Sequence, residues 1–419
     1  MNIPRLLLPA LVAAALACPQ LRGGSNAVLD WNEQVVNATR LSRNPPPIAA
    51  LHFASFHAAI FDTVNSFSRK YQGWLVNDPA PAGANMEAAI AGAAYTVVDE
   101  LWGKAANPYN FKAAYDKALA AIPDGPAKTD GLAWGRHVAE LILAERAKTP
   151  LPPAEKQYTS NEPGKWRETP PGFRPPVTPT LGSVKPFALE SSSQFRAPPP
   201  QLVGSKEYAE ELAFVNKVGP RDNAERTEYQ TLSTPFWSDD LGSATPPGHW
   251  NVIARDLAIR RNLSLEDCAR LFALINIAGA DAGITCWETK YFYSTWRPET
   301  ALRETDPATN ANVKVNPDFI PNMASPAFPS YTSGHSTYTA AMSHMIELVL
   351  GTDDIEFTVT SDGLPGAVRT FKKISDARRE VGMSRIWGGI HVMSDNLEGQ
   401  KAGLKVSDWI FAHALRPRS

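Results

Sequence analysis

The chain has very little cysteine: Cys18, Cys268 and Cys286 are the only three in 419 residues. So few cysteines exclude a small scaffold held by disulfides and a cysteine-rich zinc module. Cys268 and Cys286 both lie in a stretch that we expect to be helical. We therefore expect two buried free thiols there rather than a disulfide.

The chain also has no large excess of charge. Its formal net charge is -2, so no overall field attracts nucleic acid or an anionic membrane, and we expect neither as a partner. Beyond the N-terminus we expect no apolar stretch of membrane-spanning length, and hence no membrane span. A hydrophobic content of 43% leaves ample material for a large core.

The first residues have the pattern of an export signal. Arg5 precedes a short apolar run, and Ala15-Leu16-Ala17 resembles a cleavage site. We therefore expect residues 1–17 to be a signal peptide and the mature chain to be periplasmic or secreted. Cys18 follows the cleavage site, but Ala15 does not match the large aliphatic residue of lipoproteins, so we expect no lipid anchor.

Helical periodicity dominates the rest of the chain, and the first half shows no strand-like alternation of useful length. The expected fold is all-α, with two helical bundles around a buried oxyanion pocket. We expect an N-terminal helical region over residues 18–149 and a C-terminal helical catalytic region over residues 205–419. Predicted helices include residues 86–102, 109–122, 131–148, 205–218, 223–233 and 251–262, and one that Ser264 caps and that continues towards Trp287.

Residues 150–204 differ from the helical regions. Thirteen of the 36 prolines lie within residues 150–200, which excludes a helix interior. Aromatic and basic residues are interleaved with these prolines, whereas a disordered linker is usually poor in aromatics. We expect an extended segment that wraps over the helical core, and a loose interdomain linker is the alternative.

Three short stretches in the C-terminal region carry the chemistry. The first reads Lys290-Tyr-Phe-Tyr-Ser-Thr-Trp-Arg297-Pro298. If it is helical, Lys290 and Arg297 lie two turns apart on one face, about 10.5 Å along the axis, and their side chains can converge on an anion. Pro298 would then end the helix. A polar helix face at the surface is the alternative.

The second stretch reads Phe328-Pro-Ser-Tyr-Thr-Ser333-Gly334-His335 and precedes a clear helix pattern. Thr332 or Ser333 can cap that helix, and the free N–H groups at a helix N-terminus suit an oxyanion. Gly334 lets the backbone approach closely, and His335 is placed to act as an acid or base. An ordinary cap with a bystander histidine is the alternative.

The third stretch reads Ser384-Arg385-Ile-Trp-Gly-Gly389-Ile-His391-Val-Met-Ser-Asp395. Its two glycines allow a tight turn that points Arg385 and His391 at one spot. We expect His391 to begin a helix, with Asp395 one turn further on the same face. A carboxylate there can hold one ring nitrogen and leave the other as a nucleophile or metal ligand. A helical surface pair is the alternative.

An irregular, aromatic and acidic loop lies between the predicted helices at residues 235–250. Its Asp239 and Asp240 are candidates for an acidic partner of a buried arginine. A plain surface loop fits the same residues.

Together, the three stretches resemble the vanadium-dependent haloperoxidase and type 2 phosphatidic acid phosphatase superfamily, and the wider helix order is similar to the bacterial haloperoxidase branch. The strict match covers roughly residues 287–395. Thr332 stands where the family often has proline. The resemblance implies vanadate as the cofactor, hydrogen peroxide and halide as substrates, and a peroxidase activity in which vanadium acts as a Lewis acid.

The resemblance also implies roles for individual residues. Lys290, Arg297, Ser333, Gly334 and Arg385 would bind the equatorial oxygens of vanadate. His391 would be the metal ligand, and His335 the acid–base group. Catalytic roles follow for these two histidines, for Lys290 and for Asp395. Trp287 and Phe328 match aromatic positions beside the halide site, although core packing would explain both equally well.

The same residues fit a second activity. In a soluble acid phosphatase of the superfamily, His391 would form a phospho-histidine and His335 would protonate the leaving group. A third hypothesis is a non-catalytic oxyanion-binding protein, which has no need of two histidines and a carboxylate. The sequence specifies neither the halide, nor a small organic acceptor, nor the oligomeric state, and it is compatible with a homo-oligomer.

Overall fold

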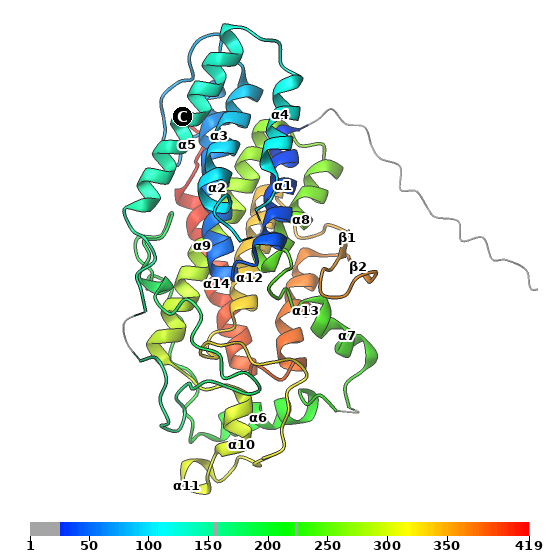
Figure 1. Cartoon of the computed structure of the whole chain (residues 1–419). Coiled ribbons are helices and arrows are strands. Elements are labelled where there is room, and N and C mark those ends of the chain that lie inside the picture. Colours follow the sequence, from blue (N-terminus) through cyan, green and yellow to red (C-terminus); the bar gives the residue numbers. More distant parts are fainter. Residues whose placement is uncertain (1–25, 107, 155–156, 223–224, 419) are drawn as a thin grey trace, which may run out of the picture.

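Helices make up nearly all the regular structure of this protein (Figure 1). The computed structural model describes residues 26–106, 108–154, 157–222 and 225–418. The predicted signal peptide and Cys18 lie outside the described residues. The all-α fold predicted from the sequence is confirmed, and the described sheet is a single two-stranded hairpin.

The N-terminal bundle contains five helices. They are α1 (Ala27–Ser42), α2 (Pro46–Ser68), α3 (Met86–Trp102), α4 (Phe111–Ala120) and α5 (Pro126–Ala147). Asparagine side chains cap α1, α3 and α4, and prolines start α2 and α5, as the free amides of a first turn favour. Helix α3 packs along α5. A Cβ atom on Gly135 would lie 1.8 Å from the carbonyl oxygen of Ala89, so this close packing requires glycine.

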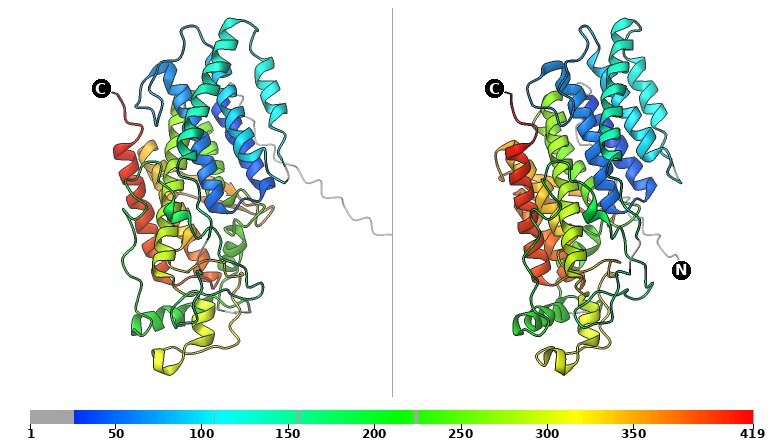
Figure 2. Two further views of the ribbon diagram at one scale, coloured as in Figure 1. Left: turned by 60° about the vertical axis from the view of Figure 1, so that its left-hand side comes forward. Right: turned by 90° about the vertical axis from the view of Figure 1, so that its left-hand side faces the viewer.

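The C-terminal part holds the remaining elements. Its helices are α6 (Lys206–Val218), α7 (Glu228–Phe236), α8 (Thr245–Arg260), α9 (Leu265–Tyr293), α10 (Pro298–Glu304), α11 (Pro307–Asn310), α12 (Gly334–Leu350), α13 (Ile374–Trp387) and α14 (Met393–His413). Strands β1 (Phe357–Thr360) and β2 (Val368–Phe371) pair antiparallel, with Phe357 opposite Phe371. Figure 2 shows α14 on the opposite side of the elongated molecule from α4 and α5.

Helix α9 is the central element of the fold. It packs against α2 of the N-terminal bundle and against α12 and α14 of the C-terminal bundle. We expected no apolar stretch of membrane-spanning length, and this was wrong: α9 is long and apolar enough by composition. However, 94% of its apolar window is buried inside the molecule, because both bundles cover it. Cys268 and Cys286, both on α9, are buried and free, as predicted.

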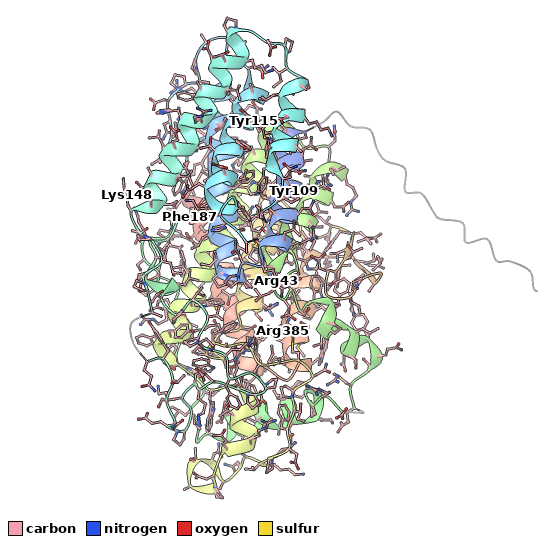
Figure 3. The ribbon with its side chains drawn as sticks, in the orientation of Figure 1. Arg43, Tyr109, Tyr115, Lys148, Phe187 and Arg385 are labelled. Carbon is pink, nitrogen blue, oxygen red and sulfur yellow. The ribbon has the colours of Figure 1, made fainter. Side chains whose placement is uncertain are left out.

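The proline-rich segment lies along α9, as expected for an extended segment that wraps over the helical core. Over the described parts of residues 150–204, its one regular element is the short 3-10 helix η1 (Leu181–Ser183). Asp281 on α9 accepts backbone N–H groups from Phe187, Ala188 and Leu189 at 2.6, 2.8 and 3.0 Å. Figure 3 shows Phe187 beside the N-terminal bundle. One buried carboxylate therefore ties this segment to the centre of the fold.

The chain between Lys290 and Arg297 differs from the prediction. Helix α9 ends at Tyr293, Ser294 has a left-handed φ of 52°, and Pro298 is the first residue of α10. The prediction that both basic residues share one helix was wrong. Proline does not end a helix here, because its fixed φ and missing N–H suit a first turn equally well.

Several other helix starts differ from the prediction. Helix α5 begins at Pro126 instead of residue 131, and α8 begins at Thr245, so the end of the irregular loop expected at residues 235–250 is helical. Helix α14 begins at Met393, so His391 precedes the helix instead of opening it. Helix α7 begins at Glu228, where Thr227 and Gln230 form a capping box. At α7 the local capping residues outweighed periodicity.

We expect Asp281→Asn to lower the free energy of unfolding by about 1–3 kcal/mol, because an amide cannot accept the same three buried N–H donors. Urea unfolding would measure the change, and limited proteolysis would report loosening within residues 157–204. Asp116→Asn, at an exposed ion pair with Lys112, is the control. Equal stability of the two variants would contradict the role given to Asp281.

Candidate oxyanion site

Three fully buried basic side chains form the centre of the site. Lys290 comes from the last turn of α9, Arg297 from the residue before α10, and Arg385 from the last turn of α13. Their exposed fractions are 0%, 0% and 1%. Burying a charge without a counter-charge costs several kcal/mol, so this cluster requires compensation.

Neutral carbonyl groups supply part of that compensation. The Lys290 ammonium donates to the carbonyl oxygens of Pro329 and Ser330 at 2.7 and 2.9 Å. Arg297 donates through Nε to Phe328 at 2.9 Å and through Nη1 to Ile390 at 3.0 Å. These contacts hold the second and third motif stretches against the first, so the three stretches do converge.

Burial lowers the pKa of all three groups. It lowers the pKa of Lys290 to about 7 and that of Arg297 to about 9. For Arg385 it lowers the pKa to about 10, against the opposing charges of Asp240 and Asp239. Because the pKa of each group is lowered, the surrounding protein does not by itself stabilise three positive charges here.

Two guanidinium donors have no protein partner. Arg297 Nη2 and Arg385 Nε are buried and make no hydrogen bond within the part of the chain that the structure describes. Buried donors are rarely left unpaired. An oxyanion with several acceptor oxygens would satisfy them and neutralise the cations, so the residues present fit a tetrahedral oxyanion such as vanadate or phosphate.

The N-terminus of α12 adds further donors. Ser333 caps this helix: its hydroxyl accepts the N–H of Ser336 at 3.3 Å, and its carbonyl accepts the N–H of Thr337 at 3.0 Å. The amides of Gly334 and His335 precede these and are the ones left for a ligand among the described residues. Helix amides of this kind bind anions.

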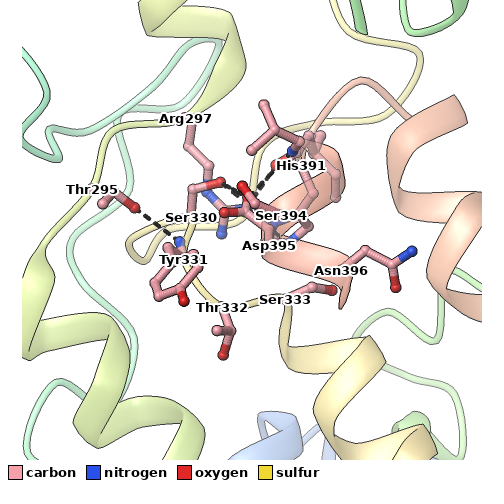
Figure 4. Close-up of polar contacts among 12 residues, drawn as sticks. Thr295, Arg297, Ser330, Tyr331, Thr332, Ser333, His391, Ser394, Asp395 and Asn396 are labelled. Carbon is pink, nitrogen blue, oxygen red and sulfur yellow. Dashed lines mark hydrogen bonds and ion pairs between the residues drawn. The ribbon is translucent and has the colours of Figure 1, made fainter. Parts of the chain in front are cut away.

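A carboxylate orients His391. Asp395 Oδ2 lies 2.8 Å from His391 Nδ1 and also accepts the Ser330 hydroxyl at 2.5 Å (Figure 4). The proton therefore sits on Nδ1, and Nε2 carries the lone pair, which faces Arg297 Nη1 at 3.2 Å. Burial, reinforced by Arg297, Lys290 and Arg385, lowers the pKa of His391 well below its usual value. The Nε2 lone pair accepts from Arg297 in this structure, and a neutral histidine with an unprotonated Nε2 can act as a nucleophile or metal ligand once that contact gives way to a ligand.

His335 has the opposite tautomer. Its Nε2 lies 3.1 Å from the carbonyl oxygen of Ser238, and a carbonyl can only accept, so Nε2 carries the proton and Nδ1 the lone pair. Burial and the nearby Arg385 lower the pKa of His335 well below its usual value. His335 is therefore neutral at pH 7 and can accept a proton.

The two predicted aromatic residues lie against the cations. The rings of Trp287 and Phe328 are 5.0 Å apart. Phe328 also lies 4.9 Å from the Lys290 ammonium and 4.9 Å from the Arg297 guanidinium carbon. Gly334 is the next neighbour, since a Cβ atom there would meet the Trp287 ring at 3.4 Å. These contacts combine core packing with a cation–π face on the site.

Some functional contacts were not predicted. Ser330 stands in the second stretch without an assigned role, and its position in that motif was the available signal. Met323 lies over Arg385 through its sulfur and also lines a cavity of about 430 Å³, together with Arg174 and Asp240. Nothing in the sequence links Met323 to Arg385. Figure 3 shows Arg385 in the lower half of the molecule as drawn.

The acidic loop contributes to the site mainly through its backbone. Arg385 Nη1 donates to the Trp237 carbonyl at 2.5 Å. The carboxylates of Asp240 and Asp239 act on Arg385 through space, and no direct ion pair to Arg385 occurs among the described residues. The acidic partners considered for a buried arginine therefore act at longer range.

Comparisons with known proteins agree with this arrangement. Residues 270–419 match the family described as the VCPO second helical-bundle domain. A curated relative, vanadium chloroperoxidase from Curvularia inaequalis, is 26% identical over an alignment of 407 residues, and the match covers 77% of this chain. The chain spans 65% of the length of that relative, slightly less than two thirds.

Solved structures share the fold. A bacterial vanadium-dependent iodoperoxidase superposes with a TM-score of 0.80 at 24% identity, covering 94% of this chain and 97% of that one. A holo-type bacterial vanadium-dependent chloroperoxidase superposes with a TM-score of 0.69 at 15% identity, covering 92% and 96%. These structural matches confirm the helical-bundle fold, and the family model and the curated relative agree with the resemblance stated from the sequence.

The lowered pKa of Lys290 predicts a pH-dependent stability. In anion-free buffer, the unfolded chain keeps a proton on Lys290 that the folded chain loses above about pH 7. The melting temperature should therefore rise between pH 7 and about 10. Lys290→Met removes this contribution, so its rise should be smaller in differential scanning fluorimetry.

Lys401→Met, at an exposed lysine, is the control and should keep the slope of the unaltered protein. An equal slope in the Lys290→Met variant would contradict a neutral buried amine at high pH.

Proposed function

We propose that this chain is a vanadium-dependent haloperoxidase. The observation that carries the proposal is the cluster of three buried cations with unpaired donors beside the lone pair of His391 Nε2. In the overall reaction, hydrogen peroxide, a halide ion and a proton yield a hypohalous acid and water. The similarity to an iodoperoxidase and to chloroperoxidases supports this reaction class.

The residues present fit vanadate as the bound oxyanion. Its oxygens would be held by Lys290, Arg297, Arg385, Ser333 and the amide of Gly334, and His391 Nε2 would bind the metal. When bound, vanadium supplies a Lewis acid that polarises peroxide oxygen without changing its own oxidation state. The three cations offset the charge of the anion and withdraw electron density from the oxygens they contact.

The two histidines divide the remaining chemistry. Asp395 keeps the proton of His391 on Nδ1, so Nε2 stays available as a ligand. His335 is neutral and has a free lone pair on Nδ1, which suits it to take a proton from hydrogen peroxide. Ser330 fixes the carboxylate of Asp395 and thereby the ring of His391.

Halide binding would fall beside Trp287 and Phe328, where two cations face an aromatic surface. The cavity lined by Met323, whose sulfur contacts Arg385, is the entrance that we propose for small substrates. The relatives use different halides, so the halide of this chain is left to the assay. We also propose export through the N-terminal leader, small organic molecules as acceptors, and self-association of the chain.

The second candidate is a soluble acid phosphatase. The observation that favours it is the same His391–Asp395 pair, because an unprotonated Nε2 can attack phosphorus as readily as it binds vanadium. In that reaction His335 would protonate the leaving group. A non-catalytic oxyanion-binding protein is the third candidate.

A paired assay distinguishes the three candidates. Purified protein is dialysed with orthovanadate and tested for peroxide-dependent oxidation of iodide, bromide and chloride, while the vanadate-free protein is tested on p-nitrophenyl phosphate. We expect halide oxidation that requires both vanadate and peroxide. Phosphate-ester hydrolysis alone would favour the phosphatase, and binding without either activity would favour the binding protein.

Single substitutions test the site. We expect His391→Ala to abolish retention of vanadate through gel filtration, because the metal ligand is lost. We expect Lys290→Ala to retain vanadate with lower affinity, by about 1.5–3 kcal/mol for one charged hydrogen-bond donor. Metal analysis and equilibrium dialysis measure both effects.

His344→Ala is the matched control, since His344 pairs with Glu347 and Asp408 outside the site. Full vanadate retention by His391→Ala would remove this residue as the ligand.

A further inference from the structure

Two neighbouring carbonyl groups of one loop fix two different site residues. The Trp237 carbonyl accepts Arg385 Nη1 at 2.5 Å, and the Ser238 carbonyl accepts His335 Nε2 at 3.1 Å. Arg385 comes from α13 and His335 from α12. The position of this loop therefore sets both the reach of a cation and the tautomer of a histidine.

The next residue of the loop forms a buried pair. Asp239 Oδ1 lies 3.0 Å from His249 Nδ1, and the side chains are 5% and 6% exposed. The second nitrogen of His249, Nε2, lies 2.9 Å from the carbonyl oxygen of Thr360 on β1. Both ring nitrogens thus face an oxygen acceptor, which favours a doubly protonated ring against a carboxylate.

The charge of this pair agrees with its surroundings. Burial alone would lower the pKa of His249, but Asp239, the Thr360 carbonyl and Asp362 together raise it. The Trp237 ring lies over His249 with centroids 4.9 Å apart. An imidazolium between a carboxylate, a carbonyl and an aromatic face is held on several sides.

The backbone of Asp239 depends on such support. Its φ is 47°, in the left-handed region that non-glycine residues seldom adopt. Such a conformation is strained and persists where the surroundings determine it. The ion pair between Asp239 and His249 on α8 holds this conformation in place, and with it the peptide groups immediately before Asp239.

We propose that the Asp239–His249 pair is a positioning device for the oxyanion site, which holds the Trp237 and Ser238 carbonyls against Arg385 and His335. Neither residue of the pair touches the reacting atoms. Their effect passes through two backbone carbonyls. Vanadate is chosen as the probe because the inference rests on the proposed function at this one point. The contacts themselves are independent of the proposed function.

The test uses the full-length protein and two variants, Asp239→Asn and His249→Phe. Asparagine keeps the shape of aspartate and removes its charge, and phenylalanine keeps the ring and removes both donors. We expect vanadate affinity to fall about 10- to 100-fold in each variant, as is typical when a residue behind a metal site is changed. Equilibrium dialysis measures the affinity.

A second measurement needs no ligand. Nitrogen-15 NMR of the eight histidines distinguishes the two neutral tautomers, and His335→Gln assigns the His335 signals. In the unaltered protein His335 should be protonated at Nε2, and in Asp239→Asn a substantial share should shift to Nδ1. A different His335 tautomer in the unaltered protein would overturn the proposal even if both variants failed to fold.

His57→Gln is the matched control. His57 is also a buried histidine with a side-chain partner, since its Nε2 lies 3.1 Å from Asn32 Oδ1, but it lies in α2 of the N-terminal bundle. We expect it to lower the melting temperature without changing vanadate affinity or the His335 spectrum.

Two outcomes separate the hypotheses. If Asp239→Asn and His249→Phe lower only the melting temperature, as His57→Gln does, the pair is merely structural and the proposal fails. If the unaltered protein binds neither vanadate nor phosphate, the proposed function fails, and the His335 tautomer still decides the role of the pair.

Discussion

The burial of Lys290, Arg297 and Arg385 without a direct carboxylate partner in the described part of the chain is the constraint on which the site depends. Backbone carbonyls satisfy many of their donors, but a carbonyl is a dipole and cannot cancel a full charge. The region therefore keeps an uncompensated positive potential and unpaired donors. A bound oxyanion would neutralise the positive potential and accept hydrogen bonds from the unpaired donors. The cluster is therefore typical of an anion site rather than of a structural ion-pair network.

The same constraint determines the states of the two histidines. Burial, reinforced by nearby cations, lowers the pKa of both His335 and His391 and keeps the two rings neutral. Their tautomers then follow from what each ring contacts: a carboxylate for His391 Nδ1 and a carbonyl for His335 Nε2. Two chemically identical side chains thereby become a ligand and a proton acceptor, with no difference in residue type.

Several features followed from local sequence. A cap at Thr332 or Ser333, the free thiols on α9 and the extended proline-rich segment were all predicted, because capping chemistry, cysteine spacing and proline act over a few residues. The structure places the cap at Ser333. The prediction of a continuous helix through Lys290 and Arg297 was wrong, because local sequence alone does not decide the backbone there. Two alternative backbone paths fit that stretch, and the left-handed turn at Ser294 is decided by packing against residues far along the chain.

What the sequence by itself determined was the chemical inventory: the cations, the two histidines, the carboxylate of Asp395 and the all-helical pattern. Residue type and short spacing encode these directly. Only the tertiary structure decided which distant groups contact and position these residues. The Trp237 and Ser238 carbonyls and the pairing of Asp239 with His249 left no recognisable trace in the sequence. Every residue carries the same carbonyl group, so its role depends on which distant side chain the fold brings to it.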